Sequence, residues 1–129
     1  GTPLGVGGYA GKREEIKAQW KKDIAELARC PNVRAKLGGF AMPDNGWNYQ
    51  TLETPVSSDQ FVADQNEWYQ FTIEQFGPER CMFESNFPVD RASVSYRVLW
   101  NAFKKMAASY SESEKHSMFW GTAESVYSV

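Results

Sequence analysis

The sequence has few of the residues from which metal and redox sites are usually built. It contains 129 residues with one histidine and two cysteines, and the cysteines, Cys30 and Cys81, are not arranged in a CxxC pattern. Two unpatterned cysteines argue against a disulfide framework and favour a reducing compartment. His116 stands among charged and polar residues of a predicted helix, so we expect a surface histidine rather than a ligand.

Long apolar runs and an excess of positive charge are also missing. No stretch approaches the roughly 20 apolar residues that a membrane-spanning helix needs. Residues 1–8 lack the basic and apolar regions of a signal peptide. The 14 Lys and Arg residues are outnumbered by 16 Asp and Glu, and they form no basic stripe. We therefore expect a cytoplasmic protein that binds neither membranes nor nucleic acid.

Apolar residues recur at helical spacing through most of the chain. Residues 12–29 carry one apolar stripe and end at a Cys-Pro pair, and residues 57–76 begin with a capping-box pattern and carry a wide aromatic face. That face favours core packing. The apolar residues are Ile16, Trp20, Ile24 and Leu27 in the first stretch, and Phe61, Trp68, Tyr69, Ile73 and Phe76 in the second.

The last third of the chain is predicted to be helical as well. Residues 95–108 form a third amphipathic stretch. Ser111 and Glu114 form a second capping box, which opens a helix that Gly121 is expected to end. Residues 122–127 then add a further turn.

Two short strands separate the helices. Residues 33–37 alternate apolar and charged side chains, whereas Cys81-Met-Phe83 is apolar throughout and fits a strand buried on both faces. Strands that alternate with long helices indicate right-handed βα units and a parallel sheet. Two strands cannot cover the wide apolar helix faces. We therefore expect part of a larger α/β protein that lacks strands at its N-terminal end, with an exposed edge that favours association or a homo-oligomer.

Polar residues follow the second strand, at the end where α/β proteins place their chemistry. Glu84, Ser85 and Asn86 come directly after it, Pro88 prevents further strand pairing, and Asp90 lies in the next loop. Glu84 and Asn86 are two residues apart, so an extended chain would point them to the same side. The competing structural interpretations are that Glu84 pairs with Arg80 or Lys36 and that Asp90 caps the following helix.

A long loop, residues 38–56, follows the first strand. Connections of this length are usually functional or disordered, and the aromatic Trp47 and Tyr49 argue against disorder. Trp47 is therefore a candidate for covering a substrate. Lys36 stands at the end of its strand before Gly38-Gly39 and is a candidate for holding a substrate carboxylate; a solvated or ion-paired lysine is the alternative.

Five motifs, in order, resemble the C-terminal part of the amidohydrolase-related family. They are Gly1-Thr-Pro-Leu-Gly, Val33-Arg-Ala-Lys-Leu-Gly-Gly39, Arg80-Cys-Met-Phe-Glu-Ser-Asn-Phe-Pro88, Leu99-Trp-Asn-Ala-Phe-Lys104 and Gly121-Thr-Ala123. The resemblance implies an α/β fold, the C-terminal part of a (β/α)8 TIM barrel of about 250 residues or more. Residues 1–129 would form one partial domain with the end of the sixth unit, the seventh and eighth units and the C-terminal helix.

The resemblance also implies a hydrolase that acts on a small carbonyl substrate, a lactone, ester or amide, at the barrel mouth. The family uses a His-x-His pair on its first strand, a histidine near the end of the sixth and an aspartate after the eighth. Asn86 stands where that aspartate is expected. An amide neither ligates a cation nor accepts a proton as a carboxylate does, so no residue of this chain is assignable to the divalent metal, zinc, that a complete barrel would hold.

The catalytic candidates are Asn86, to orient substrate or water, and Glu84 or Asp90, to move protons. The substrate-binding candidates are Lys36, Ser85 and Trp47. A decarboxylase on the same scaffold is one alternative. A non-catalytic binding or assembly module is a second alternative, and a truncated product with no activity of its own is a third. The composition does not separate the last two.

Overall fold

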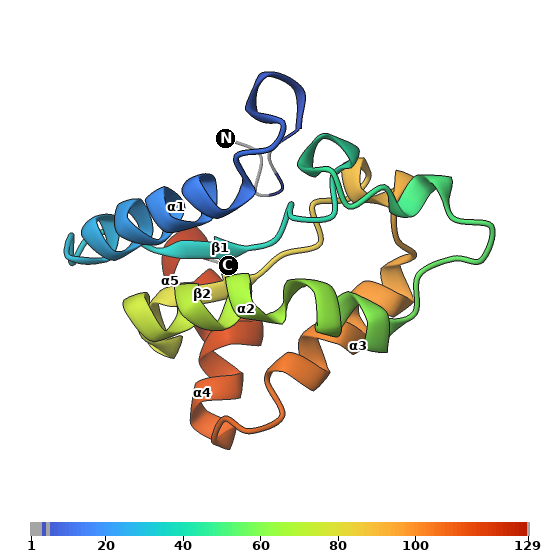
Figure 1. Ribbon diagram of the computed structural model, residues 1–129. Helices are drawn as coiled ribbons and strands as arrows, with labels where there is room; N and C mark the ends of the chain where they lie inside the picture. Colours follow the sequence, from blue (N-terminus) through green and yellow to red (C-terminus); the bar gives the residue numbers. More distant parts are fainter. Residues whose placement is uncertain (1–3, 5, 129) are drawn as a thin grey trace.

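A computed structural model describes residue 4 and residues 6–128 (Figure 1). The sequence motif Gly1-Thr-Pro-Leu-Gly lies outside the described residues except for Leu4. Two strands, β1 (Ala35–Leu37) and β2 (Cys81–Phe83), alternate with the helices. The helices are α1 (Arg13–Ala28), α2 (Ser58–Phe76), α3 (Tyr96–Met106), α4 (Glu112–His116) and α5 (Thr122–Tyr127), and a π-helical segment, Ser117–Gly121, joins the last two.

The two strands run parallel, with Leu37 opposite Phe83. α2 makes the crossover between them, as a parallel pair requires. Helices that follow one another along the chain also pack together, α1 on α2 and α2 on α3 (Figure 1). Within the described part of the chain, each strand pairs on one side only.

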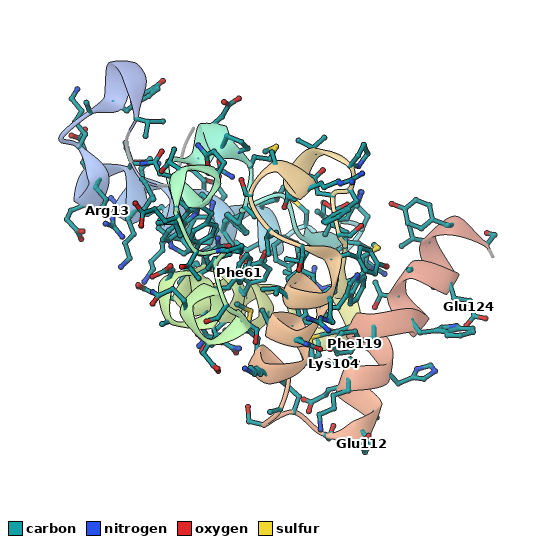
Figure 2. The ribbon with its side chains drawn as sticks, turned by 90° about the vertical axis from the view of Figure 1, so that its right-hand side faces the viewer. Arg13, Phe61, Lys104, Glu112, Phe119 and Glu124 are labelled. Atoms are coloured by element: carbon teal, nitrogen blue, oxygen red, sulfur yellow. The ribbon has the colours of Figure 1, made fainter. Side chains whose placement is uncertain are left out.

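Aromatic side chains from α2, β2 and α3 are prominent in the core, and Figure 2 labels one of them, Phe61, among densely packed side chains. Phe61, Tyr69 and Phe103 are fully buried. The Phe83 ring lies 4.7 Å from the Phe103 ring and 4.8 Å from that of Phe119, between ring centroids. The aromatic face predicted for residues 57–76 is therefore core, as expected, because it packs against both β2 and α3.

The stripe predicted for residues 12–29 is covered less well. Trp20 contacts Trp68 and Phe71 of α2, with ring centroids 4.8 and 5.7 Å apart. Leu27, at the far end of the same stripe, is 46% exposed. Leu27 is more exposed because the described residues supply no further strand beside β1 on the side of α1.

Some predicted helix ends are wrong in detail. Ser57 caps α2 by accepting from the Gln60 backbone N–H, but the Gln60 side chain donates to Asp64 instead of completing a capping box. Ser111 and Glu114 do form the full capping box. Gly121 does not end a helix: its φ of -58° is helical, and the chain continues through the π-helical segment into α5.

Residues 38–56 are ordered around two 3-10 turns, Pro43–Asn45 and Tyr49–Thr51. Cys30 is exposed and Cys81 buried, both are free, and burial raises the pKa of the Cys81 thiol to about 12. Among the residues described, no helix has the length and apolarity to cross a membrane.

The Arg80 side chain links the C-terminal end of α1 to the C-terminal end of α2. Its guanidinium donates to the carbonyl oxygens of Phe76, Cys30 and Ala28 at 2.7, 3.1 and 2.9 Å. It also lies over the Phe76 ring, 5.2 Å from the centroid. One planar donor group thus satisfies carbonyl groups at the C-terminal ends of both α1 and α2.

Arg80→Ala should lower the free energy of unfolding by about 2–3 kcal/mol, because three hydrogen bonds from a charged donor are lost together. Arg80→Lys should lose most of the same stability, because an ammonium cannot reproduce the planar fork. Urea unfolding followed by circular dichroism measures both. Arg29→Ala is the matched control; a loss for Arg80→Ala no larger than the control's would contradict this role.

Candidate functional site

The C-terminal ends of β1 and β2 lie side by side because the strands are parallel and in register. The pairing extends one residue further, where the Glu84 N–H donates to the Leu37 carbonyl at 3.2 Å. Gly38 lies directly against this residue: a Cβ there would stand 2.3 Å from Cγ of Glu84 and 2.5 Å from its carbonyl oxygen. A side chain at position 38 would therefore push the two strand ends apart.

Asn86 leaves the strand direction. Its φ is 51°, a left-handed conformation that asparagine tolerates better than most residues. β2 ends at Phe83, so the expectation that Glu84 and Asn86 point to the same side of a strand is wrong, because the alternation applies only to extended backbone. The Asn86 amide nitrogen donates to the Asp90 carboxylate at 2.7 Å.

Asp90 is almost completely buried, with 1% of its surface exposed. Burial raises the pKa of its carboxyl group and the charge of Glu84 raises it further, while hydrogen bonds from Asn86 and from the Ala41 backbone lower it; the net direction is upward. Asp90 does not cap the next helix, because Ser95 does so by accepting from the Val98 N–H at 3.3 Å. The buried carboxyl instead holds the Asn86 side chain in place.

Glu84 forms an ion pair with Lys36, with Nζ and Oε2 2.6 Å apart. This hydrogen bond and the charge of Glu84 raise the pKa of Lys36. Both side chains are partly exposed, so the pair adds little stability, but it joins the two strand ends. Of the two structural partners considered for Glu84, the structure selects Lys36, since Arg80 bonds to backbone carbonyls.

Lys36, Glu84, Asn86 and Asp90 form a polar cluster at this edge. Ser85 and Trp47 are not part of it. The Ser85 hydroxyl accepts from the Phe87 N–H at 3.3 Å, which shapes the loop. Trp47 stacks on Tyr49, with centroids 6.1 Å apart and an interplanar angle of 16°, and packs against the core. The structure therefore brings four of the six candidates to one edge and gives Trp47 mainly apolar contacts.

A groove of about 530 Å³ lies between the two loops that follow the strands, and sequence reasoning missed it. Its walls come from residues 49–56 and 87–96. Arg91 is the one charged residue among those that line it. The sequence feature that indicates this groove is Arg91, which directly follows Asp90 in the loop after a strand.

The polar cluster does not by itself fit a divalent metal. Across the described ranges, no group of three or more His, Cys, Asp or Glu side chains is placed to hold a metal ion. Asn86 is neutral, Glu84 is paired with Lys36, and Asp90 is buried and bonded to Asn86. His116 lies exposed on α4. No reaction step is therefore derived through a metal.

Two curated proteins are similar to this chain in sequence. The uncharacterized protein y4mH of Sinorhizobium fredii is 36% identical over 110 residues, which are 85% of this chain and 33% of that protein. The L-fucono-1,5-lactonase of Burkholderia multivorans is 27% identical over 113 residues, which are 87% of this chain and 36% of the lactonase. The chain thus spans about a third of the length of these relatives.

Solved structures of an amidohydrolase from Burkholderia multivorans share the fold. One, with bound HEPES, has a TM-score of 0.80 and 25% identity and covers 99% of this chain and 42% of that one. Another, with bound zinc, has a TM-score of 0.79 and 23% identity and covers 99% and 41%. The chain has the fold of the C-terminal part of a (β/α)8 barrel, as the sequence predicted.

The raised pKa of Asp90 predicts a specific pH dependence of stability. The folded state holds this proton to higher pH than the unfolded state does, so the Asp90 contribution to unfolding free energy falls as pH rises from about 4, the ordinary aspartate value. Asp90→Asn should remove this fall and gain stability relative to wild type between pH 4 and 7. Urea unfolding across that range measures it, with the exposed Asp44→Asn as control. Identical pH slopes for wild type and Asp90→Asn would contradict the assignment.

The family model described as amidohydrolase matches residues 6–129. The match covers nearly the whole chain, including both strands and the polar cluster at their ends. It confirms the resemblance drawn from the five motifs, and the relatives and solved structures agree with it. This chain belongs to the amidohydrolase family.

Proposed function

We propose that this protein is a hydrolase that opens a lactone, ester or amide bond in a small substrate at the C-terminal edge of β1 and β2. Membership of the amidohydrolase family supports the reaction class. Similarity to a lactonase supports the choice of a carbonyl substrate. The observation that carries the proposal is the Asn86 side chain, which a buried carboxylate holds at the end of β2.

Asn86 would orient the substrate or the attacking water. Its amide nitrogen is engaged by Asp90, so its carbonyl oxygen faces away from that carboxylate, and no described residue donates to it. A fixed, unoccupied acceptor is suited to a water or substrate hydroxyl that must be aligned before attack. Asp90 then acts as a positioning residue, because its contact is with Asn86 rather than with the open edge.

Glu84 is the better candidate for moving protons. Its side chain keeps 27% of its surface exposed, whereas Asp90 is 1% exposed. A general base must reach the proton that it removes, so accessibility favours Glu84. Lys36, bonded to Glu84, would hold that carboxylate in place and counter negative charge that develops on the substrate.

The role of Asn86 can be tested without straining the backbone. Asn86→Gly removes the side chain at a position with positive φ, where glycine is unstrained, and should lower kcat/KM on an accepted lactone by about 10²-fold. Asn86→Ala should lose as much activity and also some stability. The assay is turnover of a panel of lactones, esters and amides by the full-length protein.

Asn101→Ala is the matched control, because Asn101 is exposed on α3. Equal turnover by wild type and Asn86→Gly would remove Asn86 from the mechanism. No turnover of any compound in the panel by the wild-type protein would contradict the hydrolase proposal. Release of CO2 from carboxylic acids in the same assay would instead favour a decarboxylase.

The dependence of kcat on pH should distinguish the role of Glu84 from that of Asp90. Glu84→Gln should lower kcat by about 10²-fold or more and remove the acidic limb, because a neutral amide cannot accept the proton. Asp90→Asn should keep that limb, since it changes only a residue that positions Asn86. The measurement is kcat against pH for both variants. An acidic limb that survives in Glu84→Gln and disappears in Asp90→Asn would reverse the two roles.

A further inference from the structure

The groove between residues 49–56 and 87–96 carries one charge and has no counter-charge. Of the described residues that line it, Arg91 is the sole charged one and none is acidic. Arg91 is exposed, and among the described residues its guanidinium takes part in no hydrogen bond or ion pair. Five donors on a permanently charged group are therefore free at the rim of a concave site.

The first turn of α3 adds to the positive character of this groove. Ser95, the N-cap, and Tyr96, the first helical residue, both line it. The first turn of this 11-residue helix contains no acidic residue that would neutralise the helix dipole. The N-terminus of α3 and Arg91 thus favour the same sign of ligand charge.

A buried hydroxyl in the groove wall also lacks a partner. Ser93 lines the groove and is 8% exposed, and its Oγ has no hydrogen-bond partner. A buried polar group without a partner costs stability, and Ser93 Oγ is the one of five such side-chain atoms among the described residues whose residue lines the groove. This observation is independent of the charge on Arg91 and shows that a hydroxyl without a partner lies within the same wall.

The remaining walls are apolar and partly uncovered. Phe87 and Tyr96 meet edge to face, with ring centroids 5.2 Å apart and an interplanar angle of 87°. Tyr96 and Leu52 are 54% and 49% exposed although both line the groove. Uncovered aromatic and aliphatic surface beside a free cation fits a ligand with an apolar body and one anionic group.

We propose that this groove binds the carboxylate of a small organic acid, with Arg91 and the N-terminus of α3 holding the carboxylate and the Phe87–Tyr96 wall contacting the apolar body. The inference rests on the proposed function in naming the ligand as a carboxylate-bearing substrate or the acid that hydrolysis releases. The groove and the polar cluster share one loop: Phe87 follows Asn86, and Arg91 follows Asp90.

A carboxylate fits this groove better than a phosphate. A single guanidinium matches a single negative charge and can bind both carboxylate oxygens side by side. A phosphate carries a larger negative charge than a carboxylate, and among the described lining residues Arg91 is the sole cation available to balance it. The apolar walls also match an organic acid, whereas they contribute nothing to inorganic phosphate.

Binding of benzoate to the full-length protein tests the assignment without requiring turnover. Benzamide is the neutral control of the same shape, and inorganic phosphate is the competing anion. Isothermal titration calorimetry should give a dissociation constant for benzoate at least about tenfold lower than for benzamide. Arg91→Gln should weaken benzoate binding by about tenfold or more, and Arg91→Lys should recover part of it.

Two further variants serve as controls for the effect of Arg91→Gln. Ser93→Ala should weaken benzoate binding less than Arg91→Gln does, because the Ser93 hydroxyl lies within the wall and exposes almost no surface. Arg97→Gln replaces an exposed arginine of α3 that does not line the groove, so it should leave binding unchanged. Equal binding of benzoate by wild type and Arg91→Gln, or equal binding of benzoate and benzamide, would overturn the proposal. Tighter binding of phosphate than of benzoate would overturn the carboxylate assignment. The absence of benzoate binding by wild type would overturn it as well, while lactone turnover tests the hydrolase proposal separately.

Discussion

The arrangement of the whole candidate site depends on the parallel pairing of β1 and β2. Each strand has only three residues, so the pair is stable because α2 crosses over it and buries aromatic side chains against it. The register that sets Leu37 opposite Phe83 also brings Gly38 against Glu84. A shift by one residue would separate Lys36 from Glu84 and move the loop that carries Asn86.

The polar cluster at this edge contains two carboxylates in different surroundings. Glu84 is balanced by Lys36 and remains partly exposed, whereas Asp90 is buried and bonded to a neutral amide. Burial and the nearby charge of Glu84 both disfavour the ionised form of Asp90. This asymmetry is why the two acids receive different roles in the proposed reaction, one as a proton carrier and the other as a support for Asn86.

Several features of the site were accessible from the sequence, and others were not. The position of Asn86 after a buried strand follows from the order of the elements. A basic partner for Glu84 follows from charge, with Arg80 and Lys36 as the two alternatives. The left-handed turn at Asn86 and the burial of Asp90 do not, because both depend on how the loop after β2 packs against residues that follow β1. Trp47 stacks on Tyr49 and packs against the core, contacts that its place in a long loop does not predict, and its role in covering a substrate stays a prediction.

The family, the alternation of strands and helices, and the edge at which polar residues gather all follow from the amino-acid sequence alone. These properties are local or periodic, since motifs, apolar spacing and the order of elements are written along the chain. The exposure of each carboxylate and the choice of Lys36 as partner of Glu84 depend on tertiary packing. So does the position of Arg91 in a groove to which the described residues supply no counter-charge. Burial and pairing depend on residues far apart in the sequence, such as the loops after β1 and β2, which meet only when the strands pair.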